Sequence, residues 1–240
     1  MHNKTVGILG GMGPDATHYF YQKLTAMTSA EKDQEHLPVL MYSNPKLPDR
    51  ATAVLSGRKK ELIEGLQYSV SKLEKAGADF IVIPCNTAHY FVQDMQSVLS
   101  IPILNMIDLT AAHIAREGTI KRVGLLGTTA TVKWKLYDDA LKPFGVELIC
   151  PNDFDQNIVM FVIDEVKAGR CNPELKEKLD PLIESFRKQG VQKVILGCTE
   201  LPMVFESMGF DYFIDPMDIL AEATIEKAGG VLKMKGMYDK

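Results

Sequence analysis

The sequence predicts an α/β protein with two similar lobes, each a parallel sheet flanked by helices. A short apolar strand that ends in glycine occurs twice, at residues 6–10 and 123–127. Each copy is followed by a long helix, a glycine and a second apolar strand that ends just before a cysteine, Cys85 or Cys198. Strands that alternate with helices in this way are typical of parallel sheets. The shared order and spacing favour two copies of one unit over a chance likeness of short strands.

The elements follow from apolar periodicity and from turn residues. Strands are expected at residues 5–9, 39–44, 80–83, 101–104, 122–126, 147–150, 194–196 and 212–214. Helices are expected at residues 14–29, 59–75, 108–117, 157–168, 174–189 and 219–228. Pro14 suits the first position of its helix, where the missing amide hydrogen is not needed. The helix at 59–75 should bury its apolar stripe, formed by Leu62, Leu66, Val70 and Leu73.

Composition excludes several classes of protein. The 240 residues carry a formal net charge of −4 without a large basic cluster, so nucleic acid is not expected as a partner. No apolar run approaches the roughly 18 residues that span a membrane, and no signal peptide is expected at the N-terminus. Four cysteines do not make a disulfide framework, so the sequence predicts a cytoplasmic protein with free thiols.

Two cysteine turns carry the predicted chemistry, Pro-Cys-Asn-Thr-Ala-His around Cys85 and Gly-Cys-Thr-Glu-Leu-Pro around Cys198. Each cysteine stands between the end of a strand and the expected start of a helix. The dipole and the free amide groups of a helix N-terminus favour an anion, so both thiols are expected to be biased toward thiolate. Equivalent positions in the two lobes predict a pair of acid/base thiols at one site.

The glycine turn after the first strand allows two interpretations. Gly11, Gly13 and Ala16 fit a relaxed dinucleotide fingerprint, but the second strand does not end in the acidic residue that would hold a ribose. The alternative is that the glycines let the backbone at Gly11 and Met12 approach a small ligand carboxylate. We expect the second.

Further polar residues are candidates for substrate binding, each with an ordinary structural alternative. Thr128, Thr129 and Thr131 follow a strand, and their hydroxyls could bind a carboxylate or simply cap a helix. Arg50 lies in a loop after a strand and is either an anion ligand or a surface arginine. Glu200 could orient a substrate ammonium or belong to the first turn of a helix. Lys167 ends a helix, where lysine complements the helix dipole.

The remaining cysteines and the histidine suggest no further site. Cys85 and His89 are four apart, but no second ligand pair accompanies them, so no metal is expected. His89 is interpreted as a hydrogen-bonding neighbour of the turn or a packed histidine, and not as a catalyst. Cys150 and Cys171 lack the cysteine-turn context and are expected to have no role in catalysis.

The glycine turn and both cysteine turns resemble those of the aspartate/glutamate racemase family, over essentially the whole chain. The resemblance is closest to the aspartate racemases, because glutamate racemases carry Asp-Ser-Gly where this chain has Gly-Gly-Met-Gly-Pro. It implies a first lobe of residues 1–105 plus 212–240, a second lobe of 106–211, an active site in the cleft between them, and a homodimer. It also implies racemisation without pyridoxal phosphate, metal or other cofactor.

The chemistry explains why two thiols are needed, since racemisation removes the Cα proton from one face and returns a proton to the other. The resemblance implies that Cys198 takes the proton from the L-enantiomer and Cys85 from the D-enantiomer. It also implies that Arg50 and Lys167 bind the side-chain carboxylate. The α-carboxylate of the carbanion needs donors, which the turns at Asn86, Thr87, Thr128, Thr129 and Thr199 could supply.

We therefore expect a cofactor-independent racemase that interconverts L- and D-aspartate. Alternatives within the family are a broad-specificity or glutamate-preferring racemase, or a related isomerase or decarboxylase. Alternatives of another class are a dinucleotide-dependent oxidoreductase and a sensor that binds a small ligand without turnover.

Overall fold

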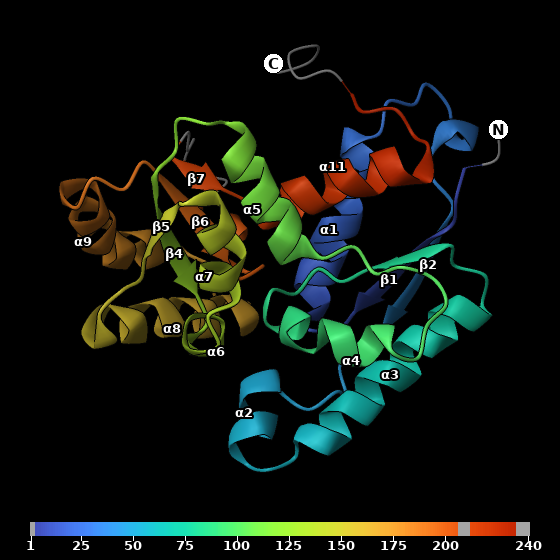
Figure 1. Cartoon of the computed structure of the whole chain (residues 1–240), viewed down its shortest axis with the longest axis horizontal. Coiled ribbons are helices and arrows are strands. Elements are labelled where there is room, and N and C mark those ends of the chain that lie inside the picture. The colour runs from blue at the N-terminus through green and yellow to red at the C-terminus, as the bar shows by residue number, and fades with distance from the viewer. Residues whose placement is uncertain (1–2, 206–211, 234–240) are drawn as a thin grey trace. The chain divides into compact units, whose positions relative to one another are not determined.

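The computed structural model describes residues 3–205 and 212–233, and the chain divides into two compact units (Figure 1). The first unit comprises Met1–Pro84, Phe91–Met106 and Met217–Lys240, and the second comprises Cys85–Tyr90 and Ile107–Pro216. Each unit contains one parallel sheet with helices packed on it, as expected from the sequence.

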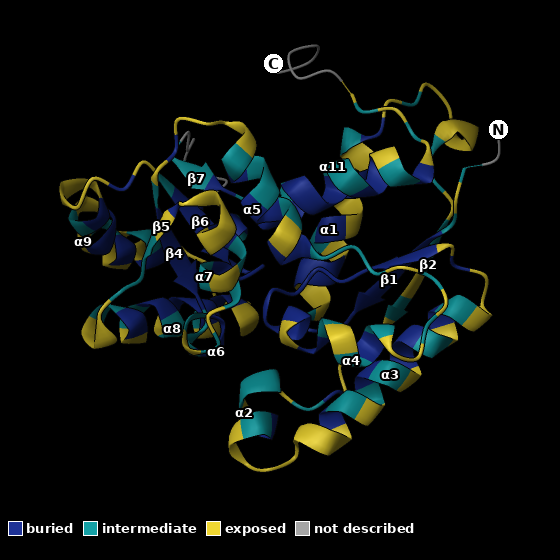
Figure 2. Cartoon of the chain, in the orientation of Figure 1, coloured by how far each residue is buried: buried dark blue, intermediate teal, exposed yellow. Residues whose placement is uncertain are grey.

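The first unit is built on a parallel sheet with the strand order β2-β1-β3. The strands are β1 (Val6–Gly10), β2 (Val39–Ser43) and β3 (Phe80–Val82). Its helices are α1 (Pro14–Met27), η1 (Asp33–Glu35), α2 (Arg50–Leu55), α3 (Lys59–Lys75), α4 (Val92–Gln96) and, from its second residue, α11 (Pro216–Ala228). Figure 2 shows the buried residues concentrated along β1, all of whose residues are buried. The apolar stripe of α3 is buried as predicted, and α3 packs against all three strands.

The second unit has the sheet order β5-β4-β6-β7. The strands are β4 (Arg122–Gly127), β5 (Glu147–Ile149), β6 (Lys193–Gly197) and β7 (Phe213–Ile214). The helices are η2 (Thr87–Phe91), α5 (Met106–Arg116), α6 (Thr129–Lys133), α7 (Leu136–Leu141), η3 (Lys142–Phe144), α8 (Asp153–Lys167), α9 (Glu174–Lys188) and α10 (Leu201–Phe205). Apolar residues of α8, α9, α10 and β6 form one continuous core.

The predicted repeat is present in the strand pairing. In each unit the glycine-ended strand, β1 or β4, pairs in parallel with the next strand on one side and with the strand before the cysteine on the other. The carboxyl ends of paired parallel strands meet at one edge of a sheet, which places the glycine turn and the cysteine turn of the second repeat next to one another.

Three expected elements differ from the structure. Residues 101–104 form no strand, because Ile103 makes only an isolated bridge with Ile81. Helix α8 begins at Asp153 rather than at 157, because the Asn152 side chain accepts a hydrogen bond from the Asp155 amide and caps the helix there. A short 3₁₀ helix, rather than an α-helix, follows the turn of Cys85.

The structure also divides the chain at other places than the resemblance implied. Strand β7 pairs with β6, so residues 212–216 belong to the second unit and not to the first. The segment Cys85–Tyr90 also belongs to the second unit, because its side chains hydrogen-bond to residues of α6 and α7.

Candidate active site

The glycine turn of the first unit is shaped by its own packing. Gly11 has a φ of +91°, and a Cβ there would lie 2.4 Å from the amide nitrogen of Asn44. The Gly11 amide donates to the Thr17 hydroxyl at 2.9 Å, and this hydroxyl donates to the Gly13 carbonyl at 2.7 Å. The close approach to Asn44 therefore requires glycine without any ligand, and the approach of a ligand to Gly11 and Met12 stays a prediction.

Arg50 lies against this glycine turn. It begins α2, which the Asp49 side chain caps by accepting from the Thr52 amide at 2.9 Å. The Arg50 Nη2 donates to the Met12 carbonyl at 3.4 Å, and its buried Nε has no hydrogen-bond partner among the described residues. The guanidinium therefore retains N–H groups that could donate hydrogen bonds to an anion, as binding of a carboxylate would require.

The turn of Cys85 is buried and held by hydrogen bonds. Cys85 is 5% exposed, and its carbonyl accepts a hydrogen bond from Nδ1 of the buried His89 at 2.9 Å. The prediction of His89 as a hydrogen-bonding neighbour is confirmed. The next residue, Asn86, accepts a hydrogen bond at Oδ1 from the hydroxyl of Tyr137, at 2.5 Å.

Three threonine hydroxyls join this turn to the turn after β4. The Thr87 oxygen lies 3.1 Å from those of Thr128 and Thr131, which lie 3.0 Å from each other. Thr128 also caps α6 by accepting a hydrogen bond from the Thr131 amide, while its binding of a carboxylate stays a prediction. Thr129 is half-buried and directs its amide to the Met160 sulfur at 3.3 Å.

The turn of Cys198 lies at the same edge of the second sheet. Gly127 and Gly197 are partners in the parallel pairing of β4 with β6. The next residues along the two strands are Thr128 and Cys198, so their turns leave the sheet side by side. Because Thr87 contacts Thr128, the turn of Cys85 and the turn of Cys198 both lie beside the turn of Thr128 at this edge of the second unit.

The Cys198 thiol faces a buried carboxylate. Its Sγ donates to Oε2 of Glu200 at 2.9 Å, and the Thr199 hydroxyl lies 3.4 Å from the same oxygen. Burial and the negative charge of Glu200 raise the pKa of Cys198 well above its usual range, although the nearby Lys167 ammonium opposes this shift. The expected bias toward thiolate is therefore wrong for Cys198, because burial outweighs the start of a five-residue helix.

Two predicted ligands act on this thiol. The positive charge of Lys167, an exposed residue at the end of α8, lowers the pKa of Cys198, and its contact with a substrate carboxylate stays a prediction. Glu200 is 4% exposed and bonded to the thiol. Its expected contact with a substrate ammonium stays a prediction.

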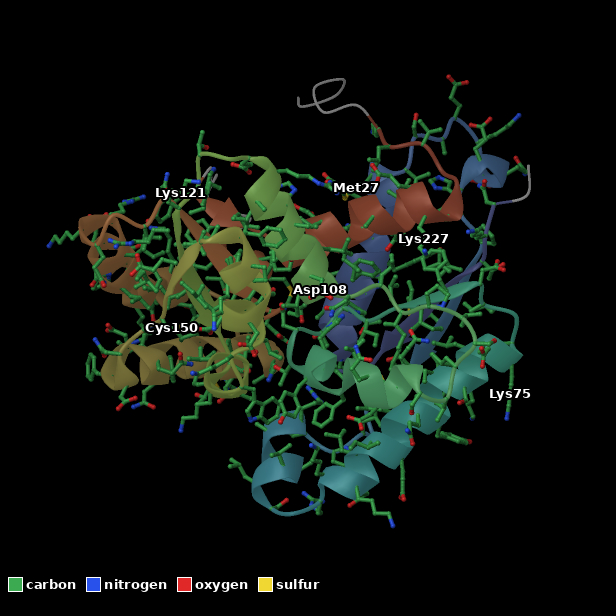
Figure 3. All side chains as sticks on the ribbon, in the orientation of Figure 1. Met27, Lys75, Asp108, Lys121, Cys150 and Lys227 are labelled. Carbon is green, nitrogen blue, oxygen red and sulfur yellow. The ribbon has the colours of Figure 1, made fainter. Side chains whose placement is uncertain are left out.

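The other two cysteines take no part in these contacts. Cys150 follows β5 (Figure 3) and is half-buried, and burial raises the pKa of its thiol to about 11. Cys171 is exposed, with its Sγ 3.7 Å from the Met203 carbonyl. The surroundings of these two thiols do not suggest a role in proton transfer.

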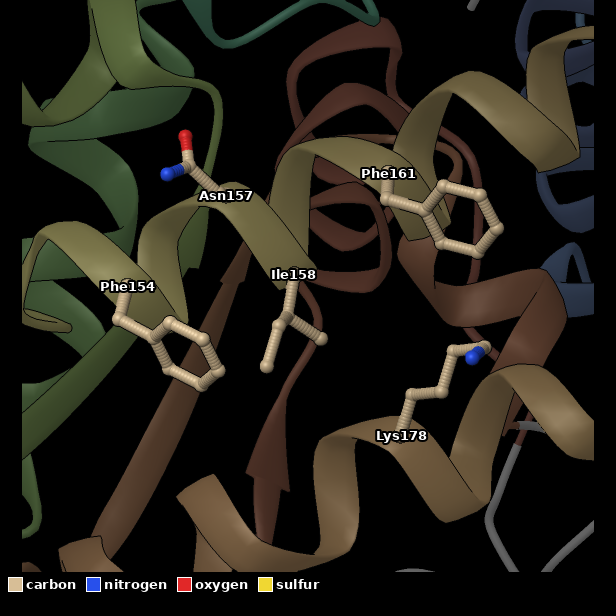
Figure 4. Close-up of a pocket in the computed structure, with 5 residues that line it drawn as sticks. All are labelled: Phe154, Asn157, Ile158, Phe161 and Lys178. Carbon is tan, nitrogen blue, oxygen red and sulfur yellow. The ribbon is translucent and has the colours of Figure 1, made fainter.

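A separate pocket of about 400 Å³ opens between the outer sides of α8 and α9 (Figure 4). Its lining consists of Phe154, Asn157, Ile158, Phe161 and Lys178. None of the predicted site residues lines it, and it offers neither a thiol nor a carboxylate.

The described residues offer neither a metal centre nor a membrane-spanning helix. Within residues 3–205 and 212–233, no three histidine, cysteine, aspartate or glutamate side chains gather in a way that could hold a metal ion. None of the helices described is both long and apolar enough to cross a membrane.

Comparison with known proteins agrees with the motifs. The family model for Asp/Glu/hydantoin racemases matches residues 9–224. The chain belongs to this family. Membership implies an isomerase of the racemase type and confirms the resemblance of the glycine and cysteine turns. It argues against the dinucleotide-dependent oxidoreductase that the glycine turn also allowed.

Relatives within the Asp/Glu/hydantoin racemase family differ in the substrates that their names state. The solved aspartate racemase of Picrophilus torridus is 37% identical, with a TM-score of 0.85 over 96% of both chains. A broad-specificity amino-acid racemase of Bacillus subtilis is 31% identical over 92% of this chain and 96% of its own length. A glutamate racemase of Aquifex aeolicus is 27% identical over 79% of this chain and 73% of its own length.

One residue of this edge, Tyr137, was not predicted from the sequence. Tyr137 is fully buried, and its hydroxyl donates to Asn86 in the turn of Cys85. It lies 51 positions from Asn86 in the sequence, and no local pattern links the two. Thr131, a predicted member of the threonine turn, is also fully buried and hydrogen-bonds to Thr87.

Proposed function

We propose that the protein interconverts L- and D-aspartate by proton transfer at Cα between two cysteines, without a cofactor. The observation that carries this proposal is the buried thiol–carboxylate pair of Cys198 and Glu200, at the same sheet edge as the turn of Cys85. Family membership and the likeness to the Picrophilus torridus enzyme support aspartate as the substrate.

The pair of Cys198 and Glu200 supplies the first base. The Cys198 thiol passes its proton to the Glu200 carboxylate, and the resulting thiolate removes the Cα proton of L-aspartate. The electron pair of the Cα–H bond stays on the substrate as a carbanion. The Cys85 thiol then gives its proton to the opposite face, which forms D-aspartate and leaves Cys85 as thiolate. The reverse reaction begins from that thiolate.

The carbanion spreads its charge onto the α-carboxylate, which needs hydrogen-bond donors. The amide of Asn86 and the hydroxyls of Thr87 and Thr128 lie at the edge where the cysteine turns meet. Donors that are already fixed in place stabilise the developing charge without reorganisation. These groups therefore favour the carbanion over the bound substrate.

In heavy water, the pure protein is expected to convert L-aspartate into D-aspartate that carries deuterium at Cα, without any added cofactor. Circular dichroism follows the change of configuration, and proton NMR follows the loss of the Cα signal. Full loss of activity after treatment with EDTA or hydroxylamine would contradict the proposal, because it would indicate a metal or a carbonyl cofactor. Faster turnover of several neutral amino acids would instead favour the broad specificity of the Bacillus subtilis relative.

Replacing Arg50 by alanine is expected to lower kcat/KM for aspartate strongly. A second carboxylate needs a cation, and the loss of one such pairing costs on the order of 2–4 kcal/mol, or about 30- to 1000-fold. A slow reaction with alanine should stay nearly unchanged. The control is Arg58→Ala, which removes an exposed arginine of the same unit. Equal losses for aspartate and alanine would show that Arg50 supports the fold or the α-carboxylate instead.

A homodimer and a cytoplasmic location remain proposals. The first rests on the resemblance to the family and the second on the free thiols. Sedimentation equilibrium of the pure protein tests the first, and fractionation of cells tests the second.

A further inference from the structure

The hydroxyl of Tyr137 holds the side chain of Asn86 in one orientation. Tyr137 belongs to α7 and is fully buried, and Asn86 is 2% exposed. The hydroxyl donates to Oδ1 of Asn86 at 2.5 Å. A side-chain amide nitrogen can only donate, so this hydrogen bond turns Oδ1 toward Tyr137 and leaves Nδ2 on the other side.

The surroundings of Tyr137 keep its hydrogen directed at Asn86. The Thr110 hydroxyl also hydrogen-bonds to the tyrosine oxygen, and burial raises the pKa of Tyr137, so the phenol stays neutral. A neutral phenol has one hydrogen. When Thr110 donates to the phenol oxygen, that hydrogen is left for Asn86.

The other end of the Asn86 amide lacks a partner. Its Nδ2 is buried, and no described residue accepts a hydrogen bond from it. Buried polar groups are nearly always hydrogen-bonded, and an exception calls for an explanation such as a ligand. The acceptor that fits two N–H donors at this edge is a carboxylate oxygen.

We propose that Tyr137 is a positioning residue, whose hydroxyl holds the Asn86 amide so that Nδ2 donates to the α-carboxylate of the bound amino acid. This inference rests on the proposed function. The charge on that carboxylate grows when the Cα proton leaves, so a donor held in place stabilises the transition state more than the bound substrate. Tyr137 therefore acts on kcat more than on KM.

The variant Tyr137→Phe removes only the hydroxyl and is expected to lower kcat for aspartate about tenfold or more, with KM changed less than threefold. The matched control is Tyr212→Phe, which removes a tyrosine hydroxyl that donates to the Val191 carbonyl in the same unit. The Tyr212→Phe control should have the kcat of the wild-type protein. A Tyr137→Phe variant with a kcat within twofold of wild type would overturn the inference.

A double-mutant cycle separates positioning from a general effect on the fold. In an Asn86→Ala background, Tyr137→Phe is expected to cause no further loss of kcat, because the amide that it holds is gone. A full second loss in that background would show that Tyr137 acts elsewhere. Wild-type racemisation in the same assay keeps the two claims apart, since an inactive wild type would refute the proposed function and an unaffected variant only this inference.

A measurement on the wild-type protein covers the case in which Tyr137→Phe does not fold. The side-chain amide of Asn86, assigned by ¹⁵N NMR, is expected to shift when a saturating mixture of L- and D-aspartate is added. An unchanged Asn86 signal at saturation would overturn the inference.

Discussion

Replacing either Cys85 or Cys198 by alanine is expected to lower racemisation of aspartate by at least about 10³-fold. Both thiols are needed in each direction, because one removes the Cα proton and the other returns a proton to the opposite face. The remaining cysteine can still exchange the proton on its own face. Cys85→Ala should therefore bring deuterium into L-aspartate without forming D-aspartate, and Cys198→Ala should do the same for the D-enantiomer only.

Proton NMR of each pure enantiomer in heavy water measures exchange, and circular dichroism measures racemisation. Cys150→Ala and Cys171→Ala are the controls and should keep most of the activity, because Cys150 follows β5 and Cys171 is exposed beside the Met203 carbonyl, both outside the two cysteine turns. Racemisation by Cys85→Ala at a near wild-type rate would refute the two-base mechanism. Exchange of both enantiomers by one single variant would refute the assignment of one face to each thiol.

The two repeated sheets could be predicted because each strand is recognisable from its own short stretch of sequence. Strands buried on both faces appear as continuous apolar runs, and β1, β3, β4 and β6 all show such runs. Their order along the chain then limits the pairing, since parallel neighbours need a helical connection between them. The paired glycine and cysteine turns follow from this pairing alone.

The incorrect predictions concern segments whose structure depends on contacts with residues far away in the sequence. The segment at 101–104 has the composition of a strand, but its pairing is limited to one bridge with β3. The place of Cys85–Tyr90 in the second unit depends on bonds from Thr87 and Asn86 to residues more than 40 positions away. Hydrogen bonds between residues so far apart cannot be predicted from a local sequence pattern.

The site was predictable in its residue types but not in its electrostatics. The sequence indicates that a thiol stands at a turn, and the dipole of the next helix suggested a lowered pKa. Only the structure shows that the Cys198 turn is enclosed and that Glu200 turns its carboxylate onto the thiol. This contact makes Glu200 a partner of Cys198, which the sequence did not predict, while its contact with a substrate ammonium stays a prediction.

Replacing Glu200 by glutamine is expected to lower kcat/KM for aspartate about 10²-fold at neutral pH, equally in both directions. The two directions must change together because the equilibrium constant of racemisation is one. In the proposed mechanism the Glu200 carboxylate accepts the thiol proton, so Cys198 need not be ionised beforehand. Glutamine cannot accept that proton, and the variant must depend on thiolate already present.

The dependence on pH distinguishes this relay from a purely electrostatic effect of Glu200. Burial, the largest cause of the raised pKa of Cys198, persists in Glu200→Gln, so the thiol stays protonated at neutral pH. The rate of the variant should then rise about tenfold per pH unit toward alkaline pH, whereas the wild-type rate should be nearly flat near neutrality. If Glu200 only raised the pKa of Cys198, its removal would increase the thiolate fraction and speed the reaction at neutral pH.

The control is Glu165→Gln, which removes a carboxylate bonded to Arg170 in the same unit and should keep the wild-type pH profile. A Glu200→Gln variant that is faster than wild type at pH 7 would refute the relay.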